Sequence, residues 1–386
     1  MLRKEGREEE RVMKKNIWTY TALVLIGIAG LGAINKYFIS GEHAFGVSPE
    51  VPWGALIASY VFFAVAATGT GLVASLGHVF RIKRFEALSK RALVASILLL
   101  TSAFGILAIE LSNPFKMIWI IFTPNFSSPI FWMGAFYGIY LVLLFGELFF
   151  SIKDKHKAAV SIAYVSLLVK IAALINLGRV FGFSSTREFW HGYYYPGYMI
   201  VTAIVSGAAV LTIMVYLISK KDASLDYTGQ PLFTSLGKIL AGAIIFLAGM
   251  QAFKLGIALT SGDTSLSGPA QAVISGPMAP SFWTMEVLVG MVIPLVILFT
   301  SRFLSRGKIL LSAALAMTGL LFSRLGFVYS GLVFPLEIVP KGCSFFDSLN
   351  MYSPTWSEWS LIFGAIGFIY LAFTVAEDKL KLEVKH

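Results

Sequence analysis

The chain has 386 residues, of which 57% are hydrophobic and only 13% are charged, and its mean hydropathy is +0.76. Soluble domains are nearer half apolar and a quarter charged. This composition therefore excludes a water-soluble enzyme, a nucleic-acid-binding domain and a secreted module, and it indicates a protein that lies in lipid. The formal net charge of +10 does not indicate nucleic-acid binding, because the position of the charges matters more than their sum.

Few residues of this chain could hold a metal or a prosthetic group. A single cysteine, Cys343, excludes an internal disulfide and an iron–sulfur cluster held by this chain's own thiolates. Two of the five histidines, His78 and His191, are expected near opposite membrane faces, so they cannot ligate one haem together. We therefore expect no metal, no haem and no iron–sulfur cluster. The N-terminal residues lead into no small-residue cleavage site, and we expect no removable signal peptide.

An all-α integral membrane protein is the predicted fold class. A helix needs roughly 20 mostly apolar residues to cross a bilayer. Ten stretches meet this requirement, in chain order at 17–39, 53–80, 91–112, 130–152, 158–178, 196–219, 236–260, 282–301, 308–334 and 357–376.

The basic residues predict the orientation of these ten spans. Alternate connections and the two chain ends carry twenty Lys and Arg residues, whereas the opposite connections carry four. Cytoplasmic loops are the ones enriched in Lys and Arg, so both termini are predicted to be cytoplasmic, in the plasma membrane of the cell. The opposite, outer connections are long and rich in Pro, Gly and aromatic residues. Those rings suit either the membrane interface or the docking of a partner protein.

A weak internal repeat divides the spans into two groups. The fourth and eighth spans begin with Phe-Trp pairs that end at Trp132 and Trp283, and one cation follows each pair at a similar distance, Lys170 and Arg324. The repeat predicts two four-helix bundles, spans 2–5 and spans 6–9, flanked by spans 1 and 10. The predicted segments are a cytoplasmic tail at 1–16, the first span at 17–39, the bundles at 53–178 and 196–334, and the last span with a cytoplasmic tail at 357–386.

Polar residues at the outer end of the first bundle are suited to a quinol. A quinol headgroup needs an acceptor for its protons, a donor that holds the quinone oxygen, and aromatic walls. A bundle end that is open to lipid could supply all three. The candidate quinone-binding and proton-accepting residues are Glu110, Arg179, His191, Trp53 and Tyr60.

Ionisable residues also occur deeper in the spans, where each costs roughly 2.5–3.5 kcal/mol and therefore calls for an explanation. Lys170, Glu147 and His78 could form an inward proton path. A second-bundle ion cluster could share one depth, and its members could neutralise one another: Lys254, Glu286, Arg324 and Glu358. For this second cluster, ion pairs that only fix helix packing are the preferred interpretation.

Five segments make the chain resemble the NrfD/polysulfide-reductase membrane-subunit family, in the ten-span branch of the PsrC, HybB and DsrP type. The resemblance covers most of the chain, and the fairly specific parts are the connection between spans 3 and 4 and an Arg…Tyr-x-Pro-x-Trp-x-Glu pattern. The segments are PWGALIASYVFF, IELSNPFKMIWIIFTPNFSSPIFW, NLGRVFG, SRLGFVYSG and MYSPTWSEW.

The resemblance implies a membrane quinone-interacting subunit of a respiratory oxidoreductase complex. Such a subunit exchanges electrons between menaquinol and a ferredoxin-like iron–sulfur subunit at the outer face, with proton translocation as an open addition. Further implied partners are a multihaem cytochrome, a molybdoenzyme, a hydrogenase or other membrane subunits. Two other classes remain open from the residues themselves: a secondary transporter that couples through its buried ion pairs, and a scaffold that anchors a soluble enzyme.

Overall fold

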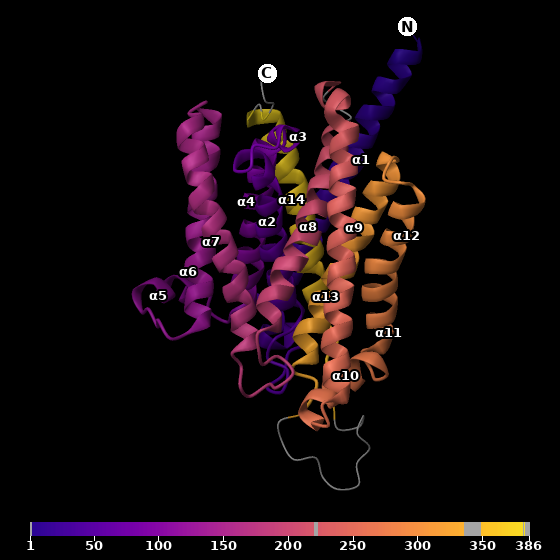
Figure 1. The fold of residues 1–386 in the computed structure, drawn as a ribbon. Coiled ribbons are helices and arrows are strands. Elements are labelled where there is room, and N and C mark those ends of the chain that lie inside the picture. The colour runs from indigo at the N-terminus through magenta and orange to yellow at the C-terminus, as the bar shows by residue number, and fades with distance from the viewer. Residues whose placement is uncertain (1, 220–222, 336–348, 381, 383–386) are drawn as a thin grey trace.

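The computed structural model describes residues 2–219, 223–335, 349–380 and 382. Every regular element in these ranges is a helix. Ten of the described helical segments are long and apolar enough to cross a membrane, which confirms the ten predicted spans. Both chain ends lie at the same end of the bundle (Figure 1). We call this end the terminal face and the opposite end the loop face.

The spans run nearly side by side along the long axis of the molecule (Figure 1). Shorter helices connect them: η1 (Asn35–Ile39), η2 (Gly41–Ala44), α3 (Lys83–Glu86), α5 (Lys116–Phe122), α10 (Thr264–Ile274) and α11 (Ala279–Ser281). The spans are formed by α1 (Leu2–Ile34), α2 (Ala55–His78), α4 (Ser89–Glu110), α6 (Pro129–Ile152), α7 (His156–Gly182), α8 (Tyr194–Ser219), α9 (Ala223–Thr260), η3 (Phe282–Val292) continued by α12 (Ile293–Thr300), α13 (Arg306–Ser330) and α14 (Trp356–Leu380).

Two helices are longer than the apolar pattern predicted. The first continues through 2–16, the segment expected as a tail, and α9 begins at Ala223 rather than at 236, with Pro231 inside it. Hydropathy marks only the part of a helix that lies in lipid. The charged residues Arg, Lys and Glu of the first segment are good helix formers and extend α1 beyond that part.

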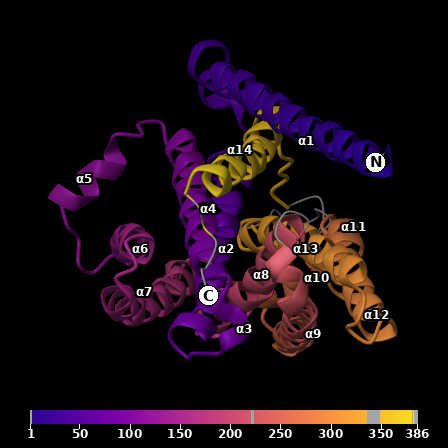
Figure 2. The ribbon, with the colours of Figure 1, turned by 90° about the horizontal axis from the view of Figure 1, so that it is seen from above.

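The helix contacts confirm the two predicted bundles and their flanking spans. In the first bundle α2 packs on α4 and α6 packs on α7, and in the second α8 packs on α9 and η3 packs on α13. Seen from above, α1 and α14 lie together beside these bundles (Figure 2). The bundles meet mainly along α2 and α8, with further contacts of α7 with α8 and of α13 with α2.

Two glycines allow α2 and α8 to approach backbone to backbone. A Cβ atom at Gly69 would overlap the carbonyl of Ala203, and one at Gly207 would overlap the carbonyl of Gly69. Small residues at such a crossing are typical of closely packed membrane helices. The two bundles are therefore in direct backbone contact near the centre of the molecule.

The internal repeat is visible in the connections as well. Each bundle has a short helix before its third span, α5 in the first and α10 in the second. The indole Nε1 of Trp132 donates back to the carbonyl of Phe126 at 2.8 Å, and that of Trp283 donates back to the carbonyl of Ile274 at 2.9 Å. The two tryptophans therefore have the same role in the two halves of the chain.

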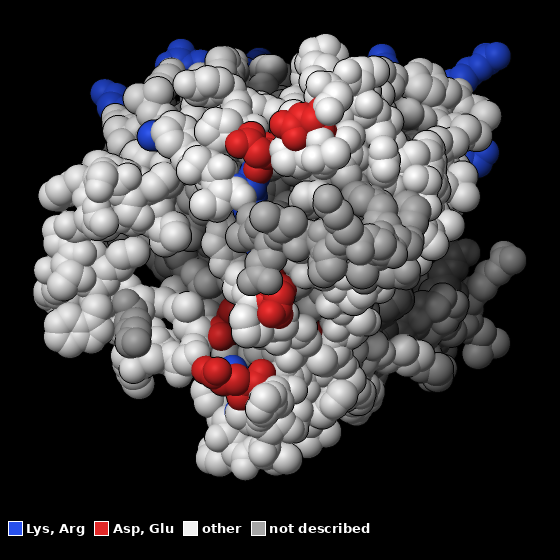
Figure 3. All heavy atoms as spheres, turned by 90° about the horizontal axis from the view of Figure 1, so that it is seen from below, with Lys and Arg blue, Asp and Glu red and all other residues white. Residues whose placement is uncertain are grey.

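The loop face differs in charge from the terminal face. Seen from below, Asp and Glu side chains lie near the middle of the molecule, whereas Lys and Arg lie mostly near its rim (Figure 3). Exposed acidic residues of this face are Glu42, Glu50, Glu188 and Asp263. A partner that docks here meets a mildly acidic surface.

An ion pair near the terminal face fastens the last span to the first bundle. Arg91 on α4 donates from Nη2 and Nε to Glu377 Oε1 on α14, at 2.7 and 2.9 Å. The side chains of Arg91 and Glu377 are 2% and 13% exposed. We expect Glu377→Ala to lower the free energy of unfolding by about 3 kcal/mol, because it removes a carboxylate that accepts charge-assisted hydrogen bonds from a buried guanidinium.

The measurement is unfolding of the detergent-solubilised chain by a denaturing detergent. The control is Asp154→Asn at the exposed pair Lys90–Asp154, where the charged atoms are 3.7 Å apart and Asp154 is 91% exposed. Asp154 has a backbone φ of 54°, which Asn also tolerates. Loss of the Lys90–Asp154 ion pair should lower the free energy of unfolding by less than about 1 kcal/mol. Equal effects of the two substitutions would contradict a special role of the buried pair.

Candidate functional site: a polar cavity near the loop face

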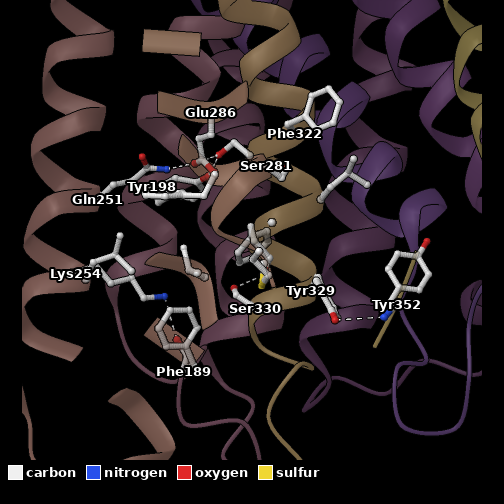
Figure 4. Close-up of a pocket in the computed structure, with 18 of the residues that line it drawn as sticks. Phe189, Tyr198, Gln251, Lys254, Ser281, Glu286, Phe322, Tyr329, Ser330 and Tyr352 are labelled. Carbon is white, nitrogen blue, oxygen red and sulfur yellow. Dashed lines mark hydrogen bonds between the residues drawn. The ribbon is translucent and has the colours of Figure 1, made fainter. Parts of the chain in front are cut away.

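A cavity of about 260 Å³ lies between the second bundle, the start of α14 and the connection that precedes α8. Many of its lining residues are aromatic, with Tyr194, Phe322, Tyr329 and Trp359 among them. Figure 4 shows its polar groups on one side, with Tyr329 and Tyr352 on the other. An apolar pocket with a few convergent polar groups is the usual form of a small-molecule site in a protein.

Glu286 is the acidic group of this cavity. It is 7% exposed, and its Oε1 accepts hydrogen bonds from Gln251 Nε2 and, at 2.6 Å, from Ser323 Oγ. Ser323 Oγ also lies 2.8 Å from the hydroxyl of Tyr198. Figure 4 shows the carboxylate between Gln251 and Tyr198. Helices α9 and α13 therefore each donate to one carboxylate, and Tyr198 of α8 is joined to it through Ser323.

Local backbone geometry places Glu286 there. It lies in an eleven-residue π-helical stretch, Phe282–Val292, which ends just before Pro294. A proline has no N–H, and its ring crowds the carbonyl four residues earlier in an α-helix. The wider π turns before Pro294 avoid this clash, and π segments of this kind are frequent at functional sites.

Lys254 is the basic group of the cavity. Its Nζ donates to the carbonyl of Phe189 at 3.0 Å and to the hydroxyl of Tyr195. The same atom lies 3.9 Å from the ring centroid of Tyr195 and 4.1 Å from that of Phe189. Within the described ranges no carboxylate is at ion-pair distance from Lys254. Aromatic faces therefore stabilise this cation in place of a carboxylate.

Arg324 lies just behind the cavity wall and is 1% exposed. Its Nη2 donates to Thr202 Oγ1 on α8, and its guanidinium carbon is 4.9 Å from the ring centroid of Tyr198. Glu286 and Tyr137 are within electrostatic reach of it. Three of the four residues predicted as an ion cluster, Lys254, Glu286 and Arg324, thus lie at or beside one cavity.

Glu358 lies elsewhere, at the N-terminus of α2. Its carboxylate accepts backbone N–H groups from Gly46 at 3.0 Å, Ala55 at 3.2 Å and Thr355 at 2.8 Å. The hydroxyl of Tyr352 donates to it at 2.6 Å. Burial, together with this neighbouring carboxylate, raises the pKa of Tyr352 well above its usual value. Glu358 therefore joins the start of α14 to the start of α2 instead of pairing with Lys254 or Arg324.

The five residues predicted to bind quinol differ in their surroundings. Trp53 stacks on Trp190 with ring centroids 5.4 Å apart, whereas Arg179 and His191 are exposed. Tyr60 is buried inside the first bundle. The charged neighbours of Glu110 are Glu358 and Lys36. Their joint action on a quinol stays a prediction.

Two of the three residues predicted to form an inward proton path, Lys170 and Glu147, are buried near each other. Lys170 is 3% exposed, and its Nζ donates to Gly71 O and Ser75 Oγ on α2, both at 3.1 Å. Glu147 is also buried and within electrostatic reach of Lys170. His78 is the last residue of α2, and its side chain lies outside the part of the structure that is described.

Sequence reasoning missed several residues of the cavity, notably Gln251, Tyr198 and Ser323. Gln251 precedes Lys254 by three residues on α9, so the two side chains share a helix face. A polar residue three positions before a lysine, inside an apolar span, was the sequence signal that could have identified Gln251. Among the described residues, no group of three His, Cys, Asp or Glu side chains is placed to hold a metal ion.

The ten spanning helices define a multi-pass membrane protein, and a polar cavity lies near one end of its bundle. Comparison with known families identifies it further. The chain belongs to the polysulphide reductase, NrfD family, whose family model matches residues 44–336.

Curated relatives are named as subunits of oxidoreductases or reductases. The chain is 26% identical over 371 residues to the Hdr-like menaquinol oxidoreductase integral membrane subunit of Archaeoglobus fulgidus, covering 92% of each chain. It is 24% identical over 409 residues to a selenate reductase subunit of Mesobacillus selenatarsenatis, again covering 92% of each. A putative dimethyl sulfoxide reductase membrane subunit of Halobacterium salinarum is 25% identical over 335 residues, covering 80% of this chain and 76% of that protein.

Proposed function

We propose that this chain is the quinone-interacting membrane subunit of a respiratory oxidoreductase complex, and that the quinone ring binds in the loop-face cavity. The cavity carries this proposal because it brings a buried carboxylate, a buried ammonium group and aromatic walls to one space. The name of the Archaeoglobus relative supports menaquinol as the substrate.

The polar groups of the cavity suit the two oxygens of a quinol. Glu286 can accept a hydrogen bond and then a proton from one hydroxyl, while Lys254 and Gln251 can donate to the oxygen of the oxidised ring. Tyr194 and Trp359 offer faces between which a flat ring can stack. Oxidation of one quinol to quinone releases two protons and two electrons.

The two electrons require an acceptor outside this chain. We propose a ferredoxin-like iron–sulfur subunit that docks on the loop face, close to the cavity. The exposed acidic residues of that face favour a partner with basic residues around its contact surface. The names of the selenate and dimethyl sulfoxide reductase relatives support a complex that ends in a further redox enzyme.

In this proposal the loop face is the outer side of the cytoplasmic membrane and both termini are cytoplasmic. The excess of Lys and Arg at the terminal face supports that orientation. Lys170, Glu147 and His78 then lie between the cavity and the cytoplasm and are candidates for proton translocation. The five residues predicted first for the ring (Glu110, Arg179, His191, Trp53 and Tyr60) are the second candidate position for the quinone.

A substitution that fills the cavity tests the position of the ring. Gly326 lines the cavity, and a Cβ built on it would lie 3.6 Å from Glu286 Oε2, with room for a side chain. We expect Gly326→Leu to weaken binding of a menaquinone analogue by about tenfold or more, since the loss of 1.4 kcal/mol corresponds to a factor of ten. Titration of the purified chain in detergent, followed by tryptophan fluorescence, measures the dissociation constant.

The matched control is Gly249→Leu on α9, an exposed glycine inside a span with no atom near its Cβ position. It should bind the analogue as the unsubstituted chain does. Unchanged binding of the analogue in Gly326→Leu would indicate that the quinone ring binds in the first bundle instead. A complete lack of quinone binding by the unsubstituted complex would contradict the function itself and would call for substrate-uptake assays of a transporter.

A further inference from the structure

An apolar groove leaves the cavity on the lipid-facing side of the molecule, between α13 and α14. Within the described ranges α14 packs mainly on α1 and α4, and α13 packs mainly on η3, α8, α12 and α2. Neither of the two helices is a main neighbour of the other. Their side chains meet beside the cavity, where the ring centroids of Phe322 and Trp359 are 6.0 Å apart.

One face of α13 forms the first side of this groove. Leu325, Phe322, Thr318, Ala314 and Leu311 are each three or four residues apart, a spacing that places side chains on one face of a helix. Leu325 and Phe322 line the cavity, whereas Thr318, Ala314 and Leu311 are exposed. The hydroxyl of Thr318 donates to the carbonyl of Ala314 at 3.1 Å. This face therefore offers an apolar surface, because its one hydroxyl is satisfied within α13.

A face of α14 forms the other side. Trp359, in the cavity wall, stacks on Phe363, and their ring centroids are 5.7 Å apart. Ile366 and Tyr370 follow at the same helical spacing, and Phe363 and Ile366 are exposed. The two helices are consecutive spans and run in opposite directions. Both faces therefore lead from the cavity toward the terminal face.

The cavity has its polar groups on the side away from this groove. Figure 4 shows Gln251 and Lys254 on one side of the cavity and Phe322 on the other. Phe322 and Trp359 belong both to the cavity and to the groove. A ring whose oxygens bind to the polar groups therefore has its remaining edge toward the groove.

We propose that the groove between α13 and α14 binds the polyprenyl tail of the quinone whose ring occupies the cavity. The proposal rests on the function proposed above and deepens it, because it assigns a site to the apolar part of the substrate. A polyprenyl quinone is a linear hydrocarbon joined to a polar ring, and here a linear apolar groove is joined to a polar cavity. A phospholipid acyl chain matches the groove but not its junction with the cavity.

Two ligands that share the naphthoquinone ring test the groove: menadione, which has no tail, and a menaquinone analogue with four isoprene units. Thr318→Trp places an indole in the groove at an exposed position. We expect this variant to bind the tailed analogue about tenfold more weakly, because the indole displaces the many dispersion contacts of the tail. Menadione should bind as it does to the unsubstituted chain. Calorimetric titration of the full chain in detergent measures both dissociation constants.

Ala314→Trp, one turn further along the same face, should have the same effect and repeats the test at a second position. The matched control is Thr101→Trp on α4, at another exposed threonine inside a span, which should change neither constant. Comparing the ratio of the two constants between variants cancels the partition of the tail into detergent. An unchanged ratio in both groove variants would overturn the tail site and leave the quinone function standing. If menadione did not bind to the unsubstituted chain, the proposed function itself would be overturned.

A photoreactive tail gives a direct readout in the intact complex. A menaquinone analogue with a diazirine at the end of its tail is bound and irradiated, and the labelled peptides are identified by mass spectrometry. We expect labels within 311–322 of α13 and 363–370 of α14, and an excess of the unlabelled analogue should remove them. Competable labelling of the first bundle alone would contradict the tail site, and so would labelling that the excess does not remove.

Discussion

Glu286→Gln should lower the rate of menaquinol oxidation by about a hundredfold or more, the usual effect of removing a general base, while the chain still folds and binds a quinone analogue. Glutamine has nearly the same shape and can still accept from Gln251 and Ser323, which hold Glu286 now. It cannot take the proton of the quinol. Stopped-flow oxidation of a menaquinol analogue by the intact complex measures the loss.

Glu110→Gln is the informative comparison, because Glu110 is the proton acceptor predicted for the first bundle. It is half-buried beside Glu358 and Lys36, and its Oε2 has no partner among the described residues. A large loss in Glu110→Gln together with normal oxidation in Glu286→Gln would place quinol chemistry in the first bundle. Glu188→Gln, at an exposed position of the loop face, should leave the rate unchanged.

Glu358→Ala should lower the free energy of unfolding by about 4 kcal/mol or more, because hydrogen bonds to a charged group are worth about 1.5–3 kcal/mol each. The substitution removes the common acceptor of three backbone N–H groups, those of Gly46, Ala55 and Thr355, of which Ala55 keeps the Tyr352 hydroxyl as a second acceptor. The carboxylate also lies at the N-terminus of α2, where a negative charge is favoured. Unfolding in a denaturing detergent measures the effect.

The matched control is Glu50→Ala, at an exposed residue of the same connection whose carboxylate accepts from Ser48 Oγ. No measurable change in stability is expected there. Glu358→Gln should fall between the two, since an amide oxygen can still accept some of these N–H groups but carries no charge. A stable Glu358→Ala chain would show that other contacts hold α14 against the start of α2.

The sequence was sufficient for the parts of the molecule that follow local rules. Apolar runs located all ten spans. The equivalent positions of Lys170 and Arg324, each following a Phe-Trp pair, predicted the two bundles. Both results depend on residues that are near one another in the chain, or on a repeat that can be counted. The helical extension of α9 to Ala223 was missed because hydropathy reports lipid contact and not helix length.

The features that the sequence did not predict depend on contacts between residues that are far apart in the chain. Glu358 was grouped with Arg324 because depth along a helix was the only available coordinate, and depth does not say which side of a helix a residue occupies. The structure turns Glu358 toward Ala55, which lies 303 positions earlier in the chain. Arg179 and Glu110 were grouped by the same coordinate, and their joint action on a quinol stays a prediction.

The position of Glu358 near the end of the chain also has a consequence for biosynthesis. A ribosome releases α2 into the membrane long before it reaches the segment that contains Tyr352 and Glu358. Until that segment is made, the first turn of α2 lacks its acceptor and the cavity lacks the wall that Tyr352 and Trp359 provide. The cavity is thus completed only when the tenth of the described spans has been made, and a chain that stops after the ninth enters the membrane without that wall.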